Sequence, residues 1–170
     1  MTDVTLRPEV PEDEAFLFKL YCSTRAEEIA AWDWPDAQRE MFLKMQFNGQ
    51  RHSYHSQFPE AERHVIQFQN DPIGRLFLSK SQNEIKLVDI ALLPEHRNQG
   101  IGTTLLRNLL AEAVNSNQKV HLYVLKSNPA RHLNPARHLY VRLGFSKVDE
   151  DELYFQMEWT PPVRSEPTAQ

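Results

Sequence analysis

The chain has 170 residues, a length typical of a single domain that buries its own hydrophobic core. Its net charge of -4, with lysines and arginines scattered along the sequence, argues against a nucleic-acid-binding surface. The start MTDVTLRP lacks the apolar run of a signal peptide or membrane span, and the only cysteine, Cys22, has no intrachain partner. We therefore expect a cytoplasmic protein that binds neither nucleic acid nor membranes, with one domain over residues 1–160 and a flexible tail over 161–170.

The first third of the sequence predicts a strand followed by two helices. VTLRP reads as a short strand, and the acidic PEDE after it suits the positive end of a helix dipole. The apolar residues of this first helix recur at helical spacing and should face the core: Phe16, Leu17, Leu20 and Tyr21. A second helix should open at Pro35 and Asp36. The residues that it should carry inward are Ala37, Met41, Phe42 and Met45.

From Arg63 onward the apolar pattern has a period of two, which predicts strands. HVIQFQ, IGRLFLSK and EIKLVDIALL are separated by short turns, so we predict an antiparallel meander whose continuously apolar third strand is central. The amphipathic helix GTTLLRNLLAEAV and the strand KVHLYVLK follow, an order that predicts a parallel crossover. ELYFQMEW alternates and should close the sheet. The predicted class is α+β, with a mixed, mainly antiparallel sheet flanked by helices.

The junction LVDIALLPEHRNQGIGTTLL carries the most informative pattern, because a buried strand runs into a glycine-containing turn and then a helix. Gly100 and Gly102 allow the backbone to approach a ligand closely. The amides of residues 98–104 should point outward at the positive end of the helix, as a cradle for an anion. The turn is not an ATP-type phosphate loop, since no Gly-Lys-Ser/Thr follows, and it lacks the third glycine of the dinucleotide motif.

Two motifs in this order resemble the GNAT superfamily of N-acetyltransferases. IALLPEHRNQGIG matches that family's acyl-CoA motif, Arg/Gln-x-x-Gly-x-Gly/Ala, at Arg97, Gly100 and Gly102. NPARHLYVRLGF matches its later Asn…Leu-Tyr…Leu-Gly-Phe motif at Asn134, Tyr140, Gly144 and Phe145. The resemblance covers about residues 4–159. It implies a GNAT-like fold and an enzyme that transfers the acetyl group of acetyl-CoA to a primary amine of a small molecule or peptide.

The resemblance also implies a site for acetyl-CoA that needs no metal. The pyrophosphate would lie on the amides of the turn, and the pantetheine arm would pair with the strand before it. The backbone N–H of Leu92 would polarise the thioester carbonyl, and Tyr140 would be the acid that protonates the leaving CoA thiolate. The residues implied to contact acetyl-CoA are Ile90, Ala91, Leu92, Arg97, Asn98, Gln99, Gly100, Ile101, Gly102, Thr103, Asn134 and its duplicate Asn128.

The general base is not evident from the sequence. An amine with a pKa of about 10 is almost fully protonated at neutral pH, so the enzyme must help to remove a proton before attack. Relatives often place a glutamate early on the fourth strand or midway along the fifth, where this chain has Lys86 and Tyr123. Asp89, Glu27 and Glu28 are alternatives, although each also fits a solvated or structurally paired carboxylate.

The hexapeptide NPARHL occurs at residues 128–133 and again at 134–139. Two copies cannot form a solenoid, and removing either copy restores the family's spacing between strand and helix. A proline inside a helix costs about 3 kcal/mol, so the helix should open at Pro135 with Asn134 as its cap, leaving Asn128–Leu133 as a loop. An alternative is that the longer linker lets the C-terminal strands exchange between the protomers of a homodimer.

The sequence does not identify the acceptor substrate, and it leaves more than one function open. The pocket would be formed by the first two helices, where Trp32 and Trp34 either line it or join the core. The acidic residues there that would attract a cation are Glu27, Glu28, Asp33 and Asp36. A non-catalytic acyl-CoA-binding or interaction protein is the second hypothesis, and O-acyl transfer to a hydroxyl is the third. His52 and His55 have no evident third metal ligand and are expected to be surface residues.

Overall fold

The computed structural model describes residues 4–126 and 135–163, and the remaining residues lie outside the description. By their internal packing the residues divide into two compact units. The first unit consists of Met1–Ser79 and Val88–Gly102, and the second unit consists of Lys80–Leu87 and Thr103–Gln170. Among the described residues, no helix combines the length and the apolar character that crossing a membrane requires.

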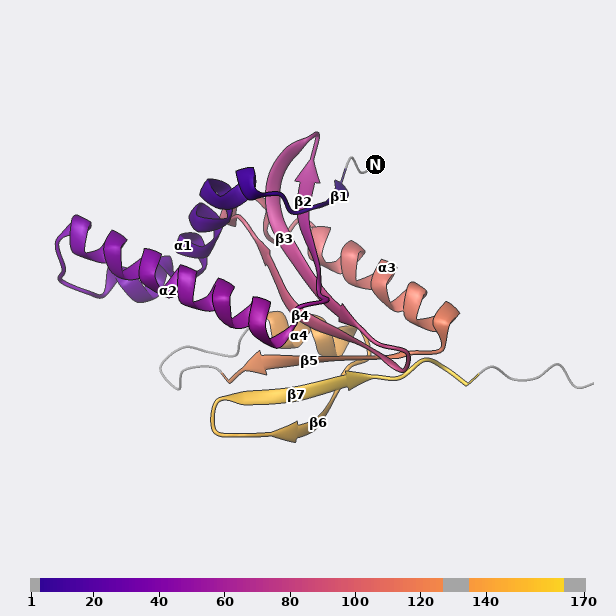
Figure 1. Ribbon diagram of the computed structural model, residues 1–170. Helices are drawn as coiled ribbons and strands as arrows, with labels where there is room; N and C mark the ends of the chain where they lie inside the picture. The colour runs from indigo at the N-terminus through magenta and orange to yellow at the C-terminus, as the bar shows by residue number, and fades with distance from the viewer. Residues whose placement is uncertain (1–3, 127–134, 164–170) are drawn as a thin grey trace, which may run out of the picture. The chain divides into compact units, whose positions relative to one another are not determined.

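The strands of the described part form one sheet in the order β1-β2-β3-β4-β5-β7-β6 (Figure 1). Neighbouring strands are antiparallel in the pairs β1–β2, β2–β3, β5–β7 and β6–β7, and β4 pairs with β5 in parallel. This pattern confirms the predicted α+β class and the parallel crossover. The strands are β1 Val4–Pro8, β2 Glu62–Phe68, β3 Asp71–Lys80, β4 Glu84–Leu92, β5 Lys119–Leu125, β6 Ser146–Glu150 and β7 Tyr154–Trp159.

The main helices occur at the places in the chain order where the sequence predicts helices. In the first unit, α1 and α2 connect β1 to β2 in the chain, and the two helices lie side by side as a hairpin (Figure 1). The helix α3 forms the crossover between β4 and β5, and α4 follows β5. The helices are η1 Pro11–Asp13, α1 Glu14–Ala30, α2 Asp36–Gln57, η2 Pro94–His96, α3 Ile101–Ser116 and α4 Pro135–Arg142.

The start of α1 is fixed by an ion pair between the buried Asp13 and the half-buried Arg7. Asp13 accepts hydrogen bonds from Nη1 and Nη2 of Arg7 at 2.7 and 2.6 Å, and from the backbone N–H of Val10 at 2.9 Å. The hydrogen bonds from Arg7 hold the pKa of Asp13 below its usual range, with the Val10 amide adding to the effect. The strand β1 is therefore tied to the helix that follows it.

The core of the first unit lies between α1 and α2. The α1 prediction is confirmed for Leu17, Leu20 and Tyr21, which are buried, whereas Phe16 is only half-buried. The ring of Phe47 on α2 lies 5.6 Å from that of Tyr21. The residues of this core cluster are Leu17, Tyr21, Ile29, Leu43 and Phe47.

The prediction for the buried face of α2 is wrong. Met41 and Met45 leave 70% and 62% of their surfaces exposed, Ala37 is also exposed, and Phe42 is half-buried. The residues that α2 contributes to the core are instead Leu43 and Phe47.

Polar side chains on the packed face of α2 explain this error. The hydroxyl of Tyr21 lies 3.4 Å from Oε1 of Gln46, and Nη2 of Arg75 donates to Oε1 of Gln50 at 3.0 Å. A hydropathy pattern assigns both glutamines to solvent, although they satisfy donors that the fold buries. The exposed methionines consequently give a more regular apolar pattern than the face that packs.

The second unit has a core between its strands and α3. On the apolar face of α3, Val114 is half-buried and the other residues are buried: Ile101, Leu105, Leu106, Leu109 and Leu110. On β5, Val120, Leu122 and Val124 alternate with more exposed residues, as a strand with one covered face requires.

The prediction that the last strand closes the sheet is wrong. The strand β7 lies between β5 and β6, so β6 forms this edge of the sheet. All five residues of β6 are exposed, and its sequence SKVDE has none of the apolar alternation that identifies a half-buried strand. The pairing of β6 with β7, rather than its own hydropathy, makes it a strand.

Candidate functional site

The backbone groups that the family resemblance implies in acetyl-CoA binding, those of Ile90 to Leu92, belong to the last residues of β4 in the first unit. The parallel register of β4 with β5 runs from Glu84 opposite Lys119 to Leu87 opposite Leu122, and β4 then continues to Leu92. On its other side β4 is held by β3, because Leu93 donates its N–H to the carbonyl of Ile73 at 2.8 Å.

Gly74 on β3 lies unusually close to this end of β4. A Cβ added to Gly74 would be 2.4 Å from the carbonyl oxygen of Ala91 and 2.7 Å from Cδ2 of Leu92. Real Cβ atoms essentially never come closer than 3.0 Å to another atom, so a side chain at residue 74 would displace β4. Gly74 was not predicted from the sequence to have a role here, although a glycine inside an otherwise apolar strand is a known sign of a close backbone approach.

The contacts with β3 determine which way the Leu92 backbone points. The Ala91 carbonyl and the Leu93 N–H both face β3. Successive residues of an extended strand direct their backbone groups to opposite edges, so the N–H and C=O of Leu92 point away from β3. By the same alternation Ile90 presents its backbone groups in the same direction. Two residues of β4 therefore offer donors and acceptors at the edge opposite β3.

The side chain of Arg97 reaches back to the same residue. Its Nε donates a hydrogen bond to the carbonyl oxygen of Leu92 at 2.8 Å. Its Nη2 lies 3.5 Å from Oγ of Ser23 on α1, at the limit of a hydrogen bond. The arginine of the predicted motif is thus bonded to the strand that precedes the turn.

The turn between β4 and α3, which is predicted to bind an anion, contains two residues with a left-handed backbone. Asn98 and Gly100 have left-handed φ angles of 59° and 81°, and α3 begins at Ile101. Gln99 donates from Nε2 to the carbonyl of Glu95 at 2.7 Å, which closes the turn on itself. Left-handed residues directly before a helix N-terminus bring successive N–H groups into one concavity. These backbone angles fit the anion cradle predicted for residues 98–104, which stays a prediction.

In the second unit, Tyr140 on α4 is buried with 7% of its surface exposed. Its ring packs edge-on against Phe145 at 5.7 Å, and its carbonyl accepts the N–H of Phe145 at 3.0 Å. Between them Gly144 has a φ of 96°, and a Cβ there would lie 3.3 Å from the Trp159 ring. The Leu-Gly-Phe part of the motif thereby fixes the tyrosine ring.

The helix α4 is described from Pro135, and the residues before it lie outside the description, so the prediction that this proline opens the helix stays a prediction. Asn128, Asn134 and the loop predicted for Asn128–Leu133 lie outside the described residues. The hypothesis about the first copy of the duplicated hexapeptide therefore remains a prediction.

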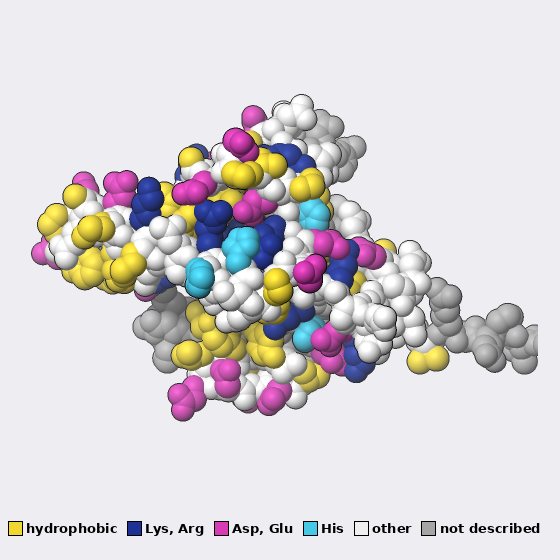
Figure 2. Space-filling model, viewed as in Figure 1, with side chains coloured by type: hydrophobic (Ala, Val, Ile, Leu, Met, Phe, Trp, Pro, Cys, Tyr) yellow, Lys and Arg dark blue, Asp and Glu magenta, His cyan; other side chains and the backbone are white. Residues whose placement is uncertain are grey.

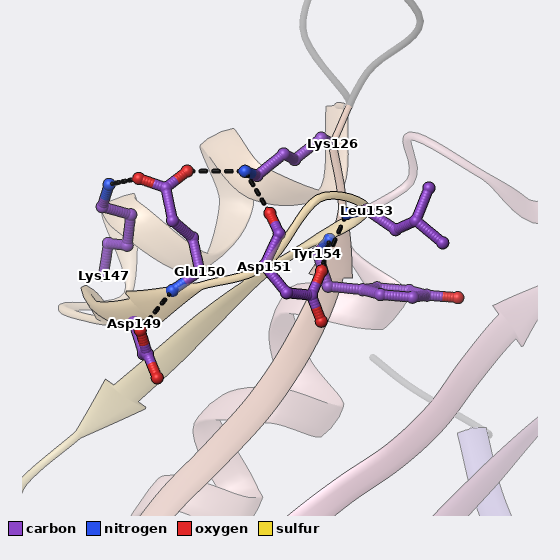
Figure 3. A network of polar contacts seen from close by, with 7 residues as sticks. All are labelled: Lys126, Lys147, Asp149, Glu150, Asp151, Leu153 and Tyr154. Carbon is purple, nitrogen blue, oxygen red and sulfur yellow. Dashed lines mark hydrogen bonds and ion pairs between the residues drawn. The ribbon is translucent and has the colours of Figure 1, made fainter.

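The end of β5, where the chain leads into the duplicated segment, is attached to the β6–β7 turn (Figure 3). The backbone N–H of Lys126 donates to the carbonyl of Leu153 at 2.7 Å, and its ammonium contacts the carbonyl of Asp151. The same ammonium lies 2.6 Å from Glu150, which also binds Lys147 at 2.6 Å. Hydrogen bonds from Lys126 and Lys147 lower the pKa of Glu150 to about 2, so this attachment stays charged in mild acid.

Among the candidate bases, Asp89 is structurally paired. Its Oδ2 lies 2.5 Å from Nε of the buried Arg75, in a contact that is an ion pair without the alignment of a hydrogen bond. On α1, Glu28 is exposed and paired with Arg25 at 2.8 Å, and Glu27 is exposed. These contacts favour a structural role for Asp89.

Neither of the positions where relatives carry a glutamate holds an acid. The ammonium of Lys86 on β4 lies 4.8 Å from the centre of the Tyr123 ring on β5. Burial lowers the pKa of Lys86 from its usual value. The two side chains thus form a cation–π contact, and neither supplies a carboxylate.

The predicted acceptor region on α1 and α2 contains a group of three aromatic rings. The centres of Trp32 and Trp34 lie 5.1 Å apart, and Phe42 lies 5.4 and 5.5 Å from them. Trp32 packs against the core cluster, whereas Trp34 is exposed, and hydrophobic side chains cover this end of the hairpin at the left of Figure 2. The core role is therefore correct for Trp32 but not for Trp34.

A cavity in the first unit is too small for an acceptor. It is lined by Leu17, Phe47 and Arg75 among others, and its volume of about 10 Å³ is that of roughly one water molecule. His52 and His55 are exposed on α2. In the described ranges, no three His, Cys, Asp or Glu side chains gather closely enough to hold a metal ion.

Comparisons with known proteins identify the family and the fold. The model of the acetyltransferase (GNAT) family matches residues 22–145. No curated protein matches the sequence. The structure resembles the PaiA N-acetyltransferase of Thermoplasma acidophilum in complex with coenzyme A, with a TM-score of 0.67, 19% identity and coverage of 92% of this chain and 98% of that chain.

Two further structures are similar. The spermidine N-acetyltransferase of Vibrio cholerae, in complex with CoA and spermine, has a TM-score of 0.60 and 21% identity over 93% of this chain and 95% of that chain. A GNAT family acetyltransferase of Elizabethkingia anophelis with acetyl-CoA bound has a TM-score of 0.55 and 16% identity over 93% and 98%. At these identities the likeness shows the fold.

Proposed function

The protein belongs to the GNAT family of acetyltransferases, and on this premise we propose that it transfers the acetyl group of acetyl-CoA to a primary amine of a small molecule or peptide by direct attack. The observation that carries the proposal is the hydrogen bond from the Leu93 N–H to the Ile73 carbonyl on β3, because strand alternation then directs the Leu92 N–H to the opposite edge of β4. In this proposal the Leu92 N–H at that edge bonds the thioester carbonyl oxygen. Three of the similar structures, those described above, are complexes with CoA or acetyl-CoA.

The Leu92 N–H supplies electrostatic stabilisation to the reaction. When the amine attacks the thioester, negative charge develops on the carbonyl oxygen, and a fixed backbone donor stabilises that charge more than the neutral carbonyl. The backbone groups of Ile90 bind the amides of the pantetheine arm in the manner of an added strand. This function uses backbone atoms, so it tolerates side-chain variation at Ile90, Ala91 and Leu92.

The turn after β4 binds the pyrophosphate of acetyl-CoA in this proposal. The left-handed Asn98 and Gly100 gather the amides of residues 98–103 at the positive end of α3. Gly102 continues this backbone into the first turn of the helix. The cradle holds the cofactor by its charge, away from the bond that reacts.

Proton transfer completes the reaction. Tyr140 is the proposed acid, because a phenol is protonated at neutral pH and can protonate the leaving thiolate. Asn134 or its duplicate Asn128 is proposed to contact the cofactor. Asp89 is held by the buried Arg75, whereas Glu27 and Glu28 are exposed, so a water molecule held by Glu27 or Glu28 is the better candidate to accept the ammonium proton.

The proposal is tested by thermal unfolding with and without acetyl-CoA, followed by turnover with a panel of amines. Ligand at a hundredfold excess over its dissociation constant should add about 2.7 kcal/mol, or several degrees in melting temperature. The panel should include polyamines, because one similar structure is a spermidine N-acetyltransferase. Absence of a thermal shift at saturating acetyl-CoA would contradict the proposal.

A variant lacking Asn128–Leu133 separates the effect of the duplication from that of the fold. The variant keeps the family's spacing, so a shift in both chains would mean that the insertion is compatible with cofactor binding. A shift only in the variant would mean that the insertion blocks the site. A thermal shift without turnover of any amine would favour a non-catalytic acyl-CoA-binding protein.

A further inference from the structure

We propose that Arg97 is a positioning residue for the acyl group: its Nε–H holds the Leu92 carbonyl and thereby keeps the Leu92 N–H directed at the thioester. This inference rests on the proposed function. The family resemblance places Arg97 among the cofactor contacts, but the structure gives its Nε to the strand, at 2.8 Å from the Leu92 oxygen.

The backbone around Leu92 is fixed from two directions. On the β3 side, the Leu93 N–H bonds Ile73 at 2.8 Å, and the Ala91 carbonyl lies against Gly74 with no room for a Cβ. These contacts locate the neighbouring residues but do not bond Leu92 itself. The Arg97 guanidinium supplies a bond to Leu92 from the opposite edge.

The bond to the carbonyl also fixes the N–H. In an extended residue the N–H and C=O point to the same edge of the strand, so holding one of them there preserves the conformation that directs the other. The register that pairs β4 with β5 is given from Glu84 to Leu87, before the strand reaches Leu92. At Leu92 a side chain from the turn supplies the bond to the carbonyl.

Arginine suits this task better than another basic residue. Its guanidinium is planar and its Nε–H has a fixed direction, whereas a lysine ammonium is a flexible point charge. A hydrogen bond from a charged donor is also about twice as strong as a neutral one. Because Arg97 belongs to the turn, it links the segment that cradles the anion to the segment that holds the acyl carbonyl.

The first experiment compares two acyl donors in the Arg97→Met variant. S-acetylpantetheine lacks the pyrophosphate and adenosine of acetyl-CoA but carries the same thioester. If Arg97 positions the acyl group, kcat should fall roughly tenfold with both donors, since the lost bond involves a charged group. The Arg97→Lys variant should not recover the activity, because it keeps the charge without the fixed Nε.

A matched control removes an arginine elsewhere in the first unit. Arg39 on α2 pairs with the exposed Asp36, so Arg39→Met should leave kcat within twofold for both donors. A loss with acetyl-CoA alone, through a higher KM and with S-acetylpantetheine unaffected, would overturn the proposal and make Arg97 a pyrophosphate contact. Unchanged kinetics with both donors would also overturn it.

The second experiment needs no acceptor and no turnover. The ¹³C resonance of [1-¹³C]acetyl-CoA bound to the wild-type protein should move downfield from its position in solution, because a hydrogen bond polarises the carbonyl. In Arg97→Met the bound resonance should return toward the solution value. A bound resonance that is identical in the two proteins would overturn the positioning role alone. If acetyl-CoA does not bind the wild-type protein, the proposed function fails, and the inference fails with it.

Discussion

The end of β4 with its turn and the α1–α2 hairpin belong to the same unit, but they differ in how much of them the sequence reveals. The proposed work of residues 90–102 is done by backbone groups, which need glycine at close approaches and at left-handed positions. The hairpin works through side-chain packing, in which many apolar patterns are acceptable. A site formed by backbone groups is therefore easier to recognise in a sequence than the packed face of a helix.

The two regions also differ in the substitutions that they tolerate. Replacing a side chain at Ala91 changes little of what the strand is proposed to do, whereas one added carbon at Gly74 would meet backbone. In the hairpin the reverse holds, since the identity of Phe47 decides the core and the adjacent exposed positions are free to vary. Substitutions in the two regions should consequently fail in different measurements.

The largest expected effect is in the hairpin, where Phe47→Ala should cost about 3–5 kcal/mol of unfolding free energy. Phe47 is 1% exposed, and its ring packs against Phe18 and Tyr21 at 5.4 and 5.6 Å. Met45→Ala is the matched control, because Met45 is 62% exposed, and it should change stability by less than about 0.5 kcal/mol. Urea unfolding measures both. Similar costs for the two variants would mean that the sequence pattern, with Met45 inward, gives the correct face.

The result for α2 shows why hydropathy fails there. Met41 and Met45 are the apolar residues that a helical pattern selects, yet the packed face includes Gln46 and Gln50, whose amides bond Tyr21 and Arg75. The partners of these glutamines come from α1 and β3, far away in the sequence. A pattern within one helix cannot reveal them.

In the strand region, Gly74→Ala should cost about 1–3 kcal/mol and reduce acetyl transfer by a larger factor than this loss of stability accounts for. The added Cβ would be 2.4 Å from the Ala91 oxygen, so β4 has to move at the residues proposed to bind the acyl group. Gly49→Ala is the control, since nothing lies within 4 Å of its Cβ and alanine favours the helix by about 0.5–1 kcal/mol. Normal kcat in a stable Gly74→Ala protein would contradict the role assigned to this strand.

Gly100, Gly102 and Arg97 were predicted from a short motif that contains them, whereas Gly74 was not predicted. Gly74 acts through a neighbouring strand, and its partner Ala91 follows 17 residues later (91 − 74) in the sequence. The contact of Arg97 with Leu92 was also beyond reach, because a motif gives a residue type without the direction of its side chain. The strand β6 was not predicted, because its pairing with β7, and not its own hydropathy, makes it a strand.

A smaller effect concerns pH and the ion pair that joins β1 to α1. The Arg7 hydrogen bonds lower the pKa of Asp13 in the folded state, so its contribution to stability is present above the unfolded pKa of about 3.9 and is lost as the pH falls through the folded pKa. Asp13→Asn should therefore cost about 2 kcal/mol at neutral pH and flatten the acid end of the stability profile. Urea unfolding from pH 7 to pH 3 measures both. Equal slopes for the two proteins below pH 4 would mean that Asp13 is not the group responsible.

The smallest expected effect on stability is at the turn, where Gly100→Ala should cost about 1 kcal/mol. Nothing lies within 4 Å of a Cβ at Gly100, so the cost comes only from placing a side chain at a φ of 81°. The turn should relax toward another conformation and lose several-fold in acetyl-CoA affinity, which titration calorimetry measures.

Gly100→Asn separates conformation from space in the same turn. Asparagine occupies the left-handed region more readily than alanine, as Asn98 does in this turn with a φ of 59°. The asparagine variant should therefore bind acetyl-CoA more tightly than the alanine variant although its side chain is larger. The opposite order would mean that crowding at the turn, rather than backbone conformation, determines affinity, and the contrast between a backbone site and a packed hairpin would no longer hold there.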